Sequence, residues 1–250
     1  MDLGIAERTA LVMGASRGLG RAIAAALARE GAWVAIASRS RERLEEARAE
    51  MEGVVVAFEA DAADLDRLPA LCGEVEAARG QVDILVANTG GPPFGGALDN
   101  TLDQWEQAYR SLVLAPRVLV AAVLPGMRER GWGRIVNVGS SSVREPIPHL
   151  TLSNAHRMAA IGFFKTLASE VAGDGITVNT VATGRFATDR LASNWGSWEE
   201  MEQRAPEGVP AGRLGRPEEY GDLVAFLCSE RAAYLTGSVI PLDGGLLRSV

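Results

Sequence analysis

The chain has 250 residues, of which 47% are hydrophobic and 23% charged, and its formal net charge is −7 at pH 7. This length and apolar content suit one large α/β domain or two small ones with an ample core. The acidic balance argues against a nucleic-acid partner, because binding to phosphate groups favours a basic surface.

The N-terminal residues and the few cysteines predict the compartment. Residues 1–8 carry acids where a secretory signal peptide would be basic, and they lack its long apolar stretch. No apolar run reaches the roughly 18 residues of a membrane-spanning helix. Cys72 and Cys228 fall in unrelated predicted helices, and with only two His and two Cys a structural zinc site is not expected. We therefore expect a cytoplasmic protein with buried thiols, no metal and no membrane partner.

Apolar strands alternate with helical segments along the whole chain. We expect strands at 9–12, 33–37, 54–58, 82–86, 134–138, 176–181 and 238–242. Helices are expected at 21–30, 41–51, 65–78, 102–130, 152–171 and 217–229, with a kink at Pro116 in the long one. Strands that are apolar along both faces and joined by helices predict a parallel sheet covered on both sides, a doubly wound α/β fold of the Rossmann type. Because no linker or repeat interrupts residues 1–250, one domain is expected.

A glycine-rich turn, Met-Gly-Ala-Ser-Arg-Gly-Leu-Gly, lies between the first strand and the first helix at residues 13–20. Free backbone N–H groups and the positive end of a helix bind anions at such a turn, and glycines let the ligand approach closely. The spacing Gly-x-x-x-Gly-x-Gly differs from the Gly-x-Gly-x-x-Gly of the long-chain dinucleotide enzymes. The glycines alone are equally consistent with an ordinary turn, and the surrounding elements favour a phosphate site.

Residues 184–215 form a long segment that departs from the regular alternation. A long insertion at the carboxyl end of a strand usually covers the ligand crevice, so we expect a substrate lid here. The alternative is a disordered surface loop, which Trp195 and Trp198 argue against because they need a packing partner.

Seven motifs, in order and over nearly the whole length, resemble the classical short-chain dehydrogenase/reductase family, and within it the 3-oxoacyl carrier-protein reductases. The family's Asn-Asn-Ala-Gly motif corresponds to residues 87–90, where Ala87 replaces the first Asn. The matching residues are the glycine turn 13–20, Asp61 at the adenine position, 88–90, the strand 135–140, 174–179, 216–219, and 235–237 with 243–245.

Cofactor choice depends on the residues after the second strand. Enzymes that prefer NAD carry an acid there, which would repel the extra phosphate of NADP. This chain has Ser38 and Arg39, with Arg17 in the turn nearby, and two guanidinium groups suit a 2′-phosphate. A pair of ordinary surface arginines is the alternative; we expect NADP(H). By this resemblance the cofactor-binding residues are Gly14, Ser16, Arg17, Gly18, Leu19, Gly20, Ser38, Arg39, Asp61, Ala62, Asn88, Gly90, Arg157 and Gly184.

The catalytic positions depart from the family pattern, which requires a Tyr and a Lys four residues later on one helix, together with a Ser and an Asn. Ser140 is in place. Ser153 stands at the Tyr position, Arg157 at the Lys position and Ser111 at the Asn position. Only one of the four expected side chains is therefore present.

The replacements still allow part of the family's chemistry. Ser153 and Arg157 are separated by four residues and share a helix face. Arg157 can donate hydrogen bonds to the nicotinamide ribose and can stabilise a developing alkoxide. An aliphatic hydroxyl is a much weaker acid than a phenol, so Ser153 cannot replace the tyrosine directly. It is also shorter, which leaves space for a water or a substrate group.

Other titratable side chains are weaker candidates for the proton donor. His156 follows Ser153 by three residues and titrates near neutral pH, but a histidine packed against a neighbouring helix or subunit is favoured. His149 lies in a proline-rich loop that could line the crevice. The tyrosines 109, 220 and 234 each fall on a different predicted element from Ser153.

Three functions remain open. The first is an NADPH-dependent reductase of a carbonyl, such as a 3-oxoacyl thioester, in which Ser153 and Ser111 order a water that delivers the proton. The second is a catalytically weak NADPH-binding sensor or partner protein, favoured by the joint loss of Tyr and Lys. The third is an elimination or isomerisation that needs no phenolic acid.

The family resemblance also implies a homotetramer, built on the helices 102–130 and 152–171 and on the C-terminal strand. The loop 90–96 and the segment 184–215 are expected to line the substrate pocket. Phe94 and Trp195 suggest an apolar substrate portion, although packing would use the same residues.

Overall fold

A single parallel sheet organises the protein, and the computed structural model describes residues 1–249. Its strands are β1 (Thr9–Met13), β2 (Trp33–Ser38), β3 (Val54–Glu59), β4 (Ile84–Ala87), β5 (Gly133–Val138), β6 (Ile176–Thr183) and β7 (Val239–Leu242). Their order is β3-β2-β1-β4-β5-β6-β7, with every neighbouring pair parallel. The expected doubly wound α/β fold is confirmed.

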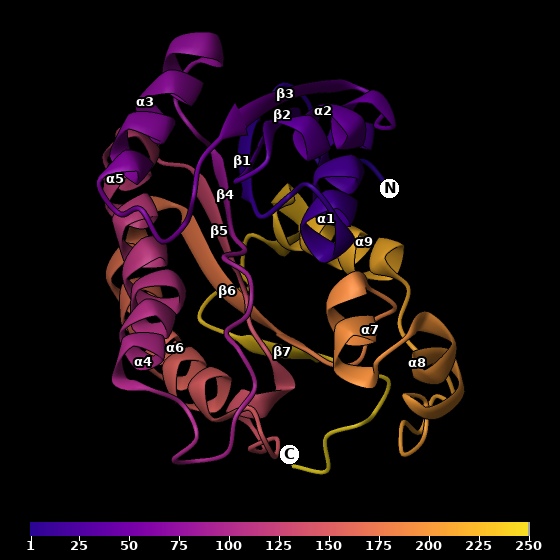
Figure 1. The fold of residues 1–250 in the computed structure, drawn as a ribbon. Helices are drawn as coiled ribbons and strands as arrows, with labels where there is room; N and C mark the ends of the chain where they lie inside the picture. Colours follow the sequence, from indigo (N-terminus) through magenta and orange to yellow (C-terminus); the bar gives the residue numbers. More distant parts are fainter. Residues whose placement is uncertain (250) are drawn as a thin grey trace.

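Helices cover both faces of the sheet (Figure 1). One face carries α1 (Gly18–Arg29), α2 (Arg41–Ala49) and α9 (Pro217–Leu227). The other carries α3 (Arg67–Arg79), α4 (Leu102–Tyr109), α5 (Ala115–Arg130) and α6 (Thr151–Val171). Two short helices, α7 (Asp189–Trp195) and α8 (Trp198–Arg204), follow β6.

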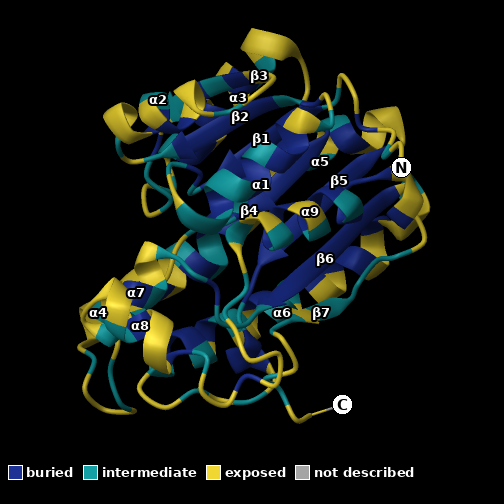
Figure 2. Cartoon of the chain, turned by 90° about the vertical axis from the view of Figure 1, so that its right-hand side faces the viewer, coloured by how far each residue is buried: buried dark blue, intermediate teal, exposed yellow. Residues whose placement is uncertain are grey.

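The core lies in two layers, one on each side of the sheet. Ile23 and Leu27 of α1 pack with Val224 of α9 on one side, and Leu71 of α3 packs with Leu119 of α5 on the other. Figure 2 shows the central strands as buried along their length, which explains why their sequences are apolar without alternation. Each layer also holds a cysteine: burial raises the pKa of Cys72 and of Cys228 to about 12, so both thiols stay protonated.

The expected element bounds are close to those observed, and most differences fall at strand and helix ends. β6 runs two residues further than expected because its pairing with β7 continues to Thr183 opposite Leu242. β4 begins at Ile84 rather than residue 82, and α3 begins at Arg67 rather than residue 65. α9 ends at Leu227, before a short 3-10 turn.

The long helix is irregular one turn before the expected kink. Residues Arg110–Leu114 form a π-helical turn between α4 and α5, in which the Ala115 N–H donates to the Arg110 carbonyl. Pro116 has no N–H, and its ring would clash with the carbonyl four residues earlier in a regular helix. The wider turn removes that clash, so the irregularity precedes Pro116 rather than lying at it.

The run Leu102–Arg130 is long and apolar enough to cross a membrane, judged by length and composition alone. By these two measures, the expectation that the chain has no stretch resembling a membrane-spanning helix is wrong. In the structure, Leu119, Val123 and Met127 of this run are buried against the sheet. A core helix of this kind passes the same test.

The segment 184–215 is folded rather than disordered. Thr188 and Ser197 cap α7 and α8 by accepting hydrogen bonds from the Leu191 and Glu200 N–H groups. A small apolar cluster that includes the fully buried Met201 packs the two helices together. Trp195 packs against this cluster as the argument against a disordered loop predicted, whereas Trp198 is 46% exposed; the role as a lid stays a prediction.

Candidate active site

A cavity of about 1320 Å³ lies at the carboxyl ends of the strands. Its lining includes Ser38 at the end of β2, Val138 at the end of β5 and Thr183 at the end of β6. In the sheet, β1 lies between β2 and β4, so the direction of the chain connections reverses there. Open α/β sheets bind ligands at this reversal. Ligand pockets usually measure roughly 300–1,000 Å³, so the cleft has room for a dinucleotide and a small molecule.

The glycine turn forms one wall, and its packing explains two of its glycines. Gly14 and Gly18 have φ of +60° and +55°, in the left-handed region. Asn88 Nδ2 donates to the Gly14 carbonyl at 3.3 Å. A Cβ on Gly20 would lie 2.2 Å from that carbonyl oxygen and 2.6 Å from Asn88 Nδ2. Gly20 therefore packs beneath the turn and is not among the residues that line the cleft, and its part in cofactor binding stays a prediction.

Ser38 and Arg39 form the far end of the cleft with Asp61 and Ala62. The Ser38 hydroxyl is buried and has no hydrogen-bond partner. Arg39 is exposed and forms no ion pair within residues 1–249. Asp61 accepts a hydrogen bond from the Ala63 N–H at 2.9 Å, which fixes the turn after β3.

Arg17 extends toward α7 and pairs with an acid there, so it does not lie unpaired beside Arg39. Its guanidinium lies 3.5 Å from the Asp189 carboxylate at the start of α7, and both side chains are more than half exposed. Such an exposed pair is weak, so it leaves Arg17 able to bind another anion. Gly184, the residue that directly follows β6, also lines the cleft, and a Cβ there would lie 2.4 Å from Asp243 Cα.

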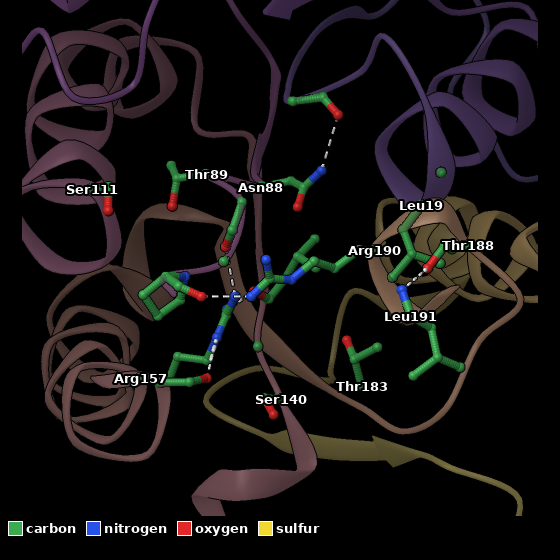
Figure 3. Close-up of a pocket in the computed structure, with 18 of the residues that line it drawn as sticks. Leu19, Asn88, Thr89, Ser111, Ser140, Arg157, Thr183, Thr188, Arg190 and Leu191 are labelled. Carbon is green, nitrogen blue, oxygen red and sulfur yellow. Dashed lines mark hydrogen bonds between the residues drawn. The ribbon is translucent and has the colours of Figure 1, made fainter. Parts of the chain in front are cut away.

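Arg157 is the most strongly tethered side chain in the site (Figure 3). Its Nε donates to Ser153 Oγ at 3.2 Å, its Nη1 to the Val138 carbonyl at 2.6 Å and its Nη2 to the Gly90 carbonyl at 2.7 Å. Burial lowers the pKa of Arg157 to about 10, and the charge of Arg190 acts in the same direction. The guanidinium therefore remains charged at neutral pH.

The three serines expected in the site all line the cleft. Ser140 follows β5, and its Oγ accepts from the Ser142 N–H at 3.1 Å. Ser153 accepts from Arg157 on the same face of α6. Ser111 lies in the π-helical turn and donates to the Gln107 carbonyl at 3.0 Å. Ser140 and Ser153 thus each keep a hydroxyl proton that is free to donate toward the cleft.

The other proton-donor candidates lie outside the cleft. His156 is buried, with Nδ1 at 2.8 Å from the Leu152 carbonyl and its ring 5.1 Å from that of Trp105, as expected for a packed histidine. His149 is exposed and does not line the cavity. Tyr220 is buried against Thr183 Oγ1 at 2.9 Å, and burial raises its pKa. No Tyr, His or Lys is among the described residues that line the cleft.

Arg190 of α7 is a cleft residue that sequence reasoning did not single out. Its Nη2 donates to the Pro92 carbonyl at 2.5 Å, and its guanidinium carbon lies 5.2 Å from the centre of the Phe94 ring. The sequence distinguishes Arg190 only as a charged residue shortly after the end of the sixth strand. The segment 184–215 carries many other charges, so this feature does not single it out.

Comparison with known proteins identifies the family. The model described as enoyl-(acyl carrier protein) reductase matches residues 14–247. The chain is 36% identical over 248 residues to human dehydrogenase/reductase SDR family member 4, covering 96% of this chain and 88% of that protein. It is 37% identical over 250 residues to nodulation protein G of Azospirillum brasilense, covering 97% and 99%.

Solved structures agree with the sequence relatives. L-sorbose reductase of Gluconobacter frateurii, crystallised with NADPH and L-sorbose, matches with a TM-score of 0.95 at 33% identity and covers 100% of both chains. YwfH, an NADPH-dependent reductase involved in bacilysin biosynthesis, matches with a TM-score of 0.93 at 29% identity and covers 98% of this chain and 100% of that one. By fold, motifs and relatives, the chain belongs to the short-chain dehydrogenase/reductase family.

Proposed function

We propose that the protein is an NADPH-dependent oxidoreductase that reduces the carbonyl group of a small molecule to an alcohol. Family membership supports the oxidoreductase class, since relatives and structural neighbours are dehydrogenases and reductases by name. The observation that carries the proposal is one continuous cleft that joins the glycine turn, the Ser38 and Arg39 corner, and the group around Arg157. The proposed setting is a cytoplasmic homotetramer, and a 3-oxoacyl thioester is the first substrate to test.

The cleft fits a dinucleotide that carries a 2′-phosphate. The bare backbone at Gly14 and Gly18 lets phosphates approach the N-terminus of α1. The unpartnered Ser38 hydroxyl would be satisfied by a ribose or phosphate oxygen. Arg39 beside it offers a guanidinium to the extra phosphate. When bound, the reduced nicotinamide supplies the hydride.

The chain's own side chains orient the carbonyl and the water that protonates it. Ser140 donates a hydrogen bond from its hydroxyl to the carbonyl oxygen. Arg157 stabilises the negative charge that develops on that oxygen and holds the nicotinamide ribose. Ser153, whose oxygen accepts from Arg157, donates a hydrogen bond to a water that also donates to Ser111 Oγ, and this water passes a proton from bulk solvent to the alkoxide that the hydride transfer leaves.

A non-catalytic NADPH-binding protein is the second candidate. The observation that favours it is the absence of a phenol, imidazole or amine from the cleft lining within residues 1–249. This candidate predicts tight NADPH binding without turnover of any carbonyl.

Replacing Ser140 with alanine is expected to lower NADPH-dependent reduction by at least about 100-fold, as for the loss of one donor to a developing oxyanion. The test follows NADPH oxidation at 340 nm with a short 3-oxoacyl thioester, and then with a panel of small ketones. Ser142→Ala is the matched control, because its buried hydroxyl has no partner and does not line the cleft. A fully active Ser140→Ala enzyme would remove Ser140 from the mechanism.

Arg39 is expected to set the preference for NADPH over NADH. Arg39→Met should reduce the ratio of the two dissociation constants by roughly 10- to 100-fold, the contribution of a charge-assisted pair. Quenching of intrinsic fluorescence measures both constants without turnover. Arg41→Met serves as control, since Arg41 pairs with Glu45 on α2 and does not line the cleft. Equal affinity of the unaltered protein for both cofactors would contradict the assignment.

A further inference from the structure

Two arginines from different helices converge on one short loop above the reaction centre. Arg157 of α6 donates to the Gly90 carbonyl at 2.7 Å, and Arg190 of α7 donates to the Pro92 carbonyl at 2.5 Å. Between these two carbonyls, a Cβ on Gly91 would lie 3.2 Å from two nitrogens of Arg190. Figure 3 shows the two side chains extending toward each other from opposite sides of the cleft.

No acid neutralises this pair. Within residues 1–249, neither guanidinium lies within ion-pair distance of a carboxylate. The described acids that line the cleft are Asp61, Glu145 and Asp189, and each is engaged elsewhere. Asp61 accepts from the Ala63 N–H, Asp189 pairs with Arg17, and Glu145 accepts from the Arg248 and Ser249 N–H groups at 2.8 and 2.7 Å.

The pair therefore creates a concentrated positive charge in a partly enclosed site. Burial lowers the pKa of both arginines, and their mutual repulsion lowers that of Arg157 further. Both remain charged at neutral pH, so the unneutralised charge favours an anionic ligand. Neutral carbonyl oxygens satisfy some of their N–H groups, but they do not balance the charge.

We infer that the substrate carries a carboxylate a few atoms from its carbonyl group, as in a 2-oxo or 3-oxo acid, and that Arg190 binds this carboxylate. The inference rests on the proposed carbonyl reduction and narrows its substrate class to free oxo acids, so it disfavours a 3-oxoacyl thioester, whose acyl carbon carries no carboxylate. The planar fork of a guanidinium matches a carboxylate through two parallel hydrogen bonds. The Phe94 ring beside Arg190 offers an apolar surface to the carbon chain that joins the two groups.

The position of Arg190 favours the substrate over the cofactor phosphates. The loop 90–94 fixes its guanidinium through Pro92 and Phe94. The phosphate-binding turn is contacted by Asn88 and, at the start of α7, by Asp189 through Arg17, whereas the hydrogen bond of Arg190 goes to the loop 90–94. Arg190 is thus a specificity residue rather than part of the phosphate site.

The test uses alcohols that cannot react with reduced cofactor, so it does not depend on turnover. 2-Hydroxybutyrate, 3-hydroxybutyrate and the methyl ester of each are titrated into the NADPH-loaded protein, and binding is measured by calorimetry. We expect at least one acid to bind more tightly than its ester. Arg190→Met is expected to weaken binding of that acid by roughly 10- to 100-fold, and to change the dissociation constant for NADPH far less.

Two controls keep the result interpretable. Arg29→Met removes a charge that pairs with Asp222 outside the cleft, so it tests for a general charge effect. Arg190→Lys keeps the charge but loses the planar fork, and is expected to recover only part of the preference.

Each outcome has one meaning. Equal binding of acids and esters to the unaltered protein overturns the inference, as does an Arg190→Met variant that loses NADPH and acid affinity equally. If a hydroxy acid binds more tightly than its ester through Arg190, but the matching oxo acid is not reduced, the result supports the carboxylate site and rejects the proposed function. The same preference with reduction of the matching oxo acid supports both.

Discussion

Arg157→Met is expected to lower kcat/KM for carbonyl reduction by about 10²- to 10³-fold, the range seen when a donor to developing negative charge is removed. The methionine keeps the apolar contacts of the arginine's aliphatic stem but removes the charge and the hydrogen bonds to Ser153, Val138 and Gly90. Stopped-flow oxidation of NADPH separates the loss in the chemical step from any loss in cofactor affinity.

Arg157→Lys distinguishes charge from tethering. A lysine keeps the positive charge, but its single nitrogen replaces three separate nitrogens that now reach three partners. We expect an activity between that of the unaltered protein and that of Arg157→Met. We also expect the loop at Gly90 to be less well fixed, because the hydrogen bond to the Gly90 carbonyl is weakened or lost. An Arg157→Met enzyme with the activity of the unaltered protein would show that the charge plays no part in the reaction.

Gly20→Ala is expected to raise the dissociation constant for NADPH by at least about 100-fold. The added Cβ would lie 2.2 Å from the Gly14 carbonyl oxygen, which is a backbone atom, so no side-chain rotation can relieve the clash. The turn must therefore open, which displaces the N–H groups that face the phosphates. Fluorescence titration with NADPH measures the loss, and circular dichroism reports whether the variant is folded.

The matched control is Gly73→Ala in α3, where a Cβ would meet no atom within 4 Å. Alanine is favoured over glycine inside a helix by about 1 kcal/mol, so this variant is expected to be at least as stable as the parent. If Gly20→Ala unfolds, Gly18→Ala tests the same turn with a milder change, because a Cβ there would come no closer than 3.6 Å to Thr188, although its φ of +55° still disfavours alanine. Unchanged NADPH affinity in a folded Gly20→Ala protein would contradict the role given to the turn.

The sheet and the phosphate-binding turn could be predicted from sequence because their signals are local. Strands buried on both faces are apolar without interruption, and the glycine turn occupies eight consecutive residues. The position of the π-helical turn at Arg110–Leu114 could not be predicted. A proline indicates that a helix is irregular nearby, but it does not indicate which turn changes its geometry.

The site could be predicted only where family motifs identified it. Arg190 contacts Pro92 across 98 positions of the chain, and no local pattern reports such a contact. Likewise, the unpartnered Ser38 hydroxyl becomes visible only once its neighbours are placed. The packing of Gly20 beneath the turn has no local signal either, because its close neighbour Asn88 follows a different strand.

The tethering of Arg157 has a consequence for how this site tolerates substitution. Its guanidinium joins the end of β5, the loop after β4 and Ser153 of its own helix. A change at position 153 alone would leave the hydrogen bonds to Val138 and Gly90 in place, whereas a change at position 157 would remove all three attachments together. Residues that share a hydrogen-bond network have non-additive effects when they are substituted. Double substitutions that combine position 157 with position 153 or with the loop 90–94 are therefore expected to depart from the sum of the single ones.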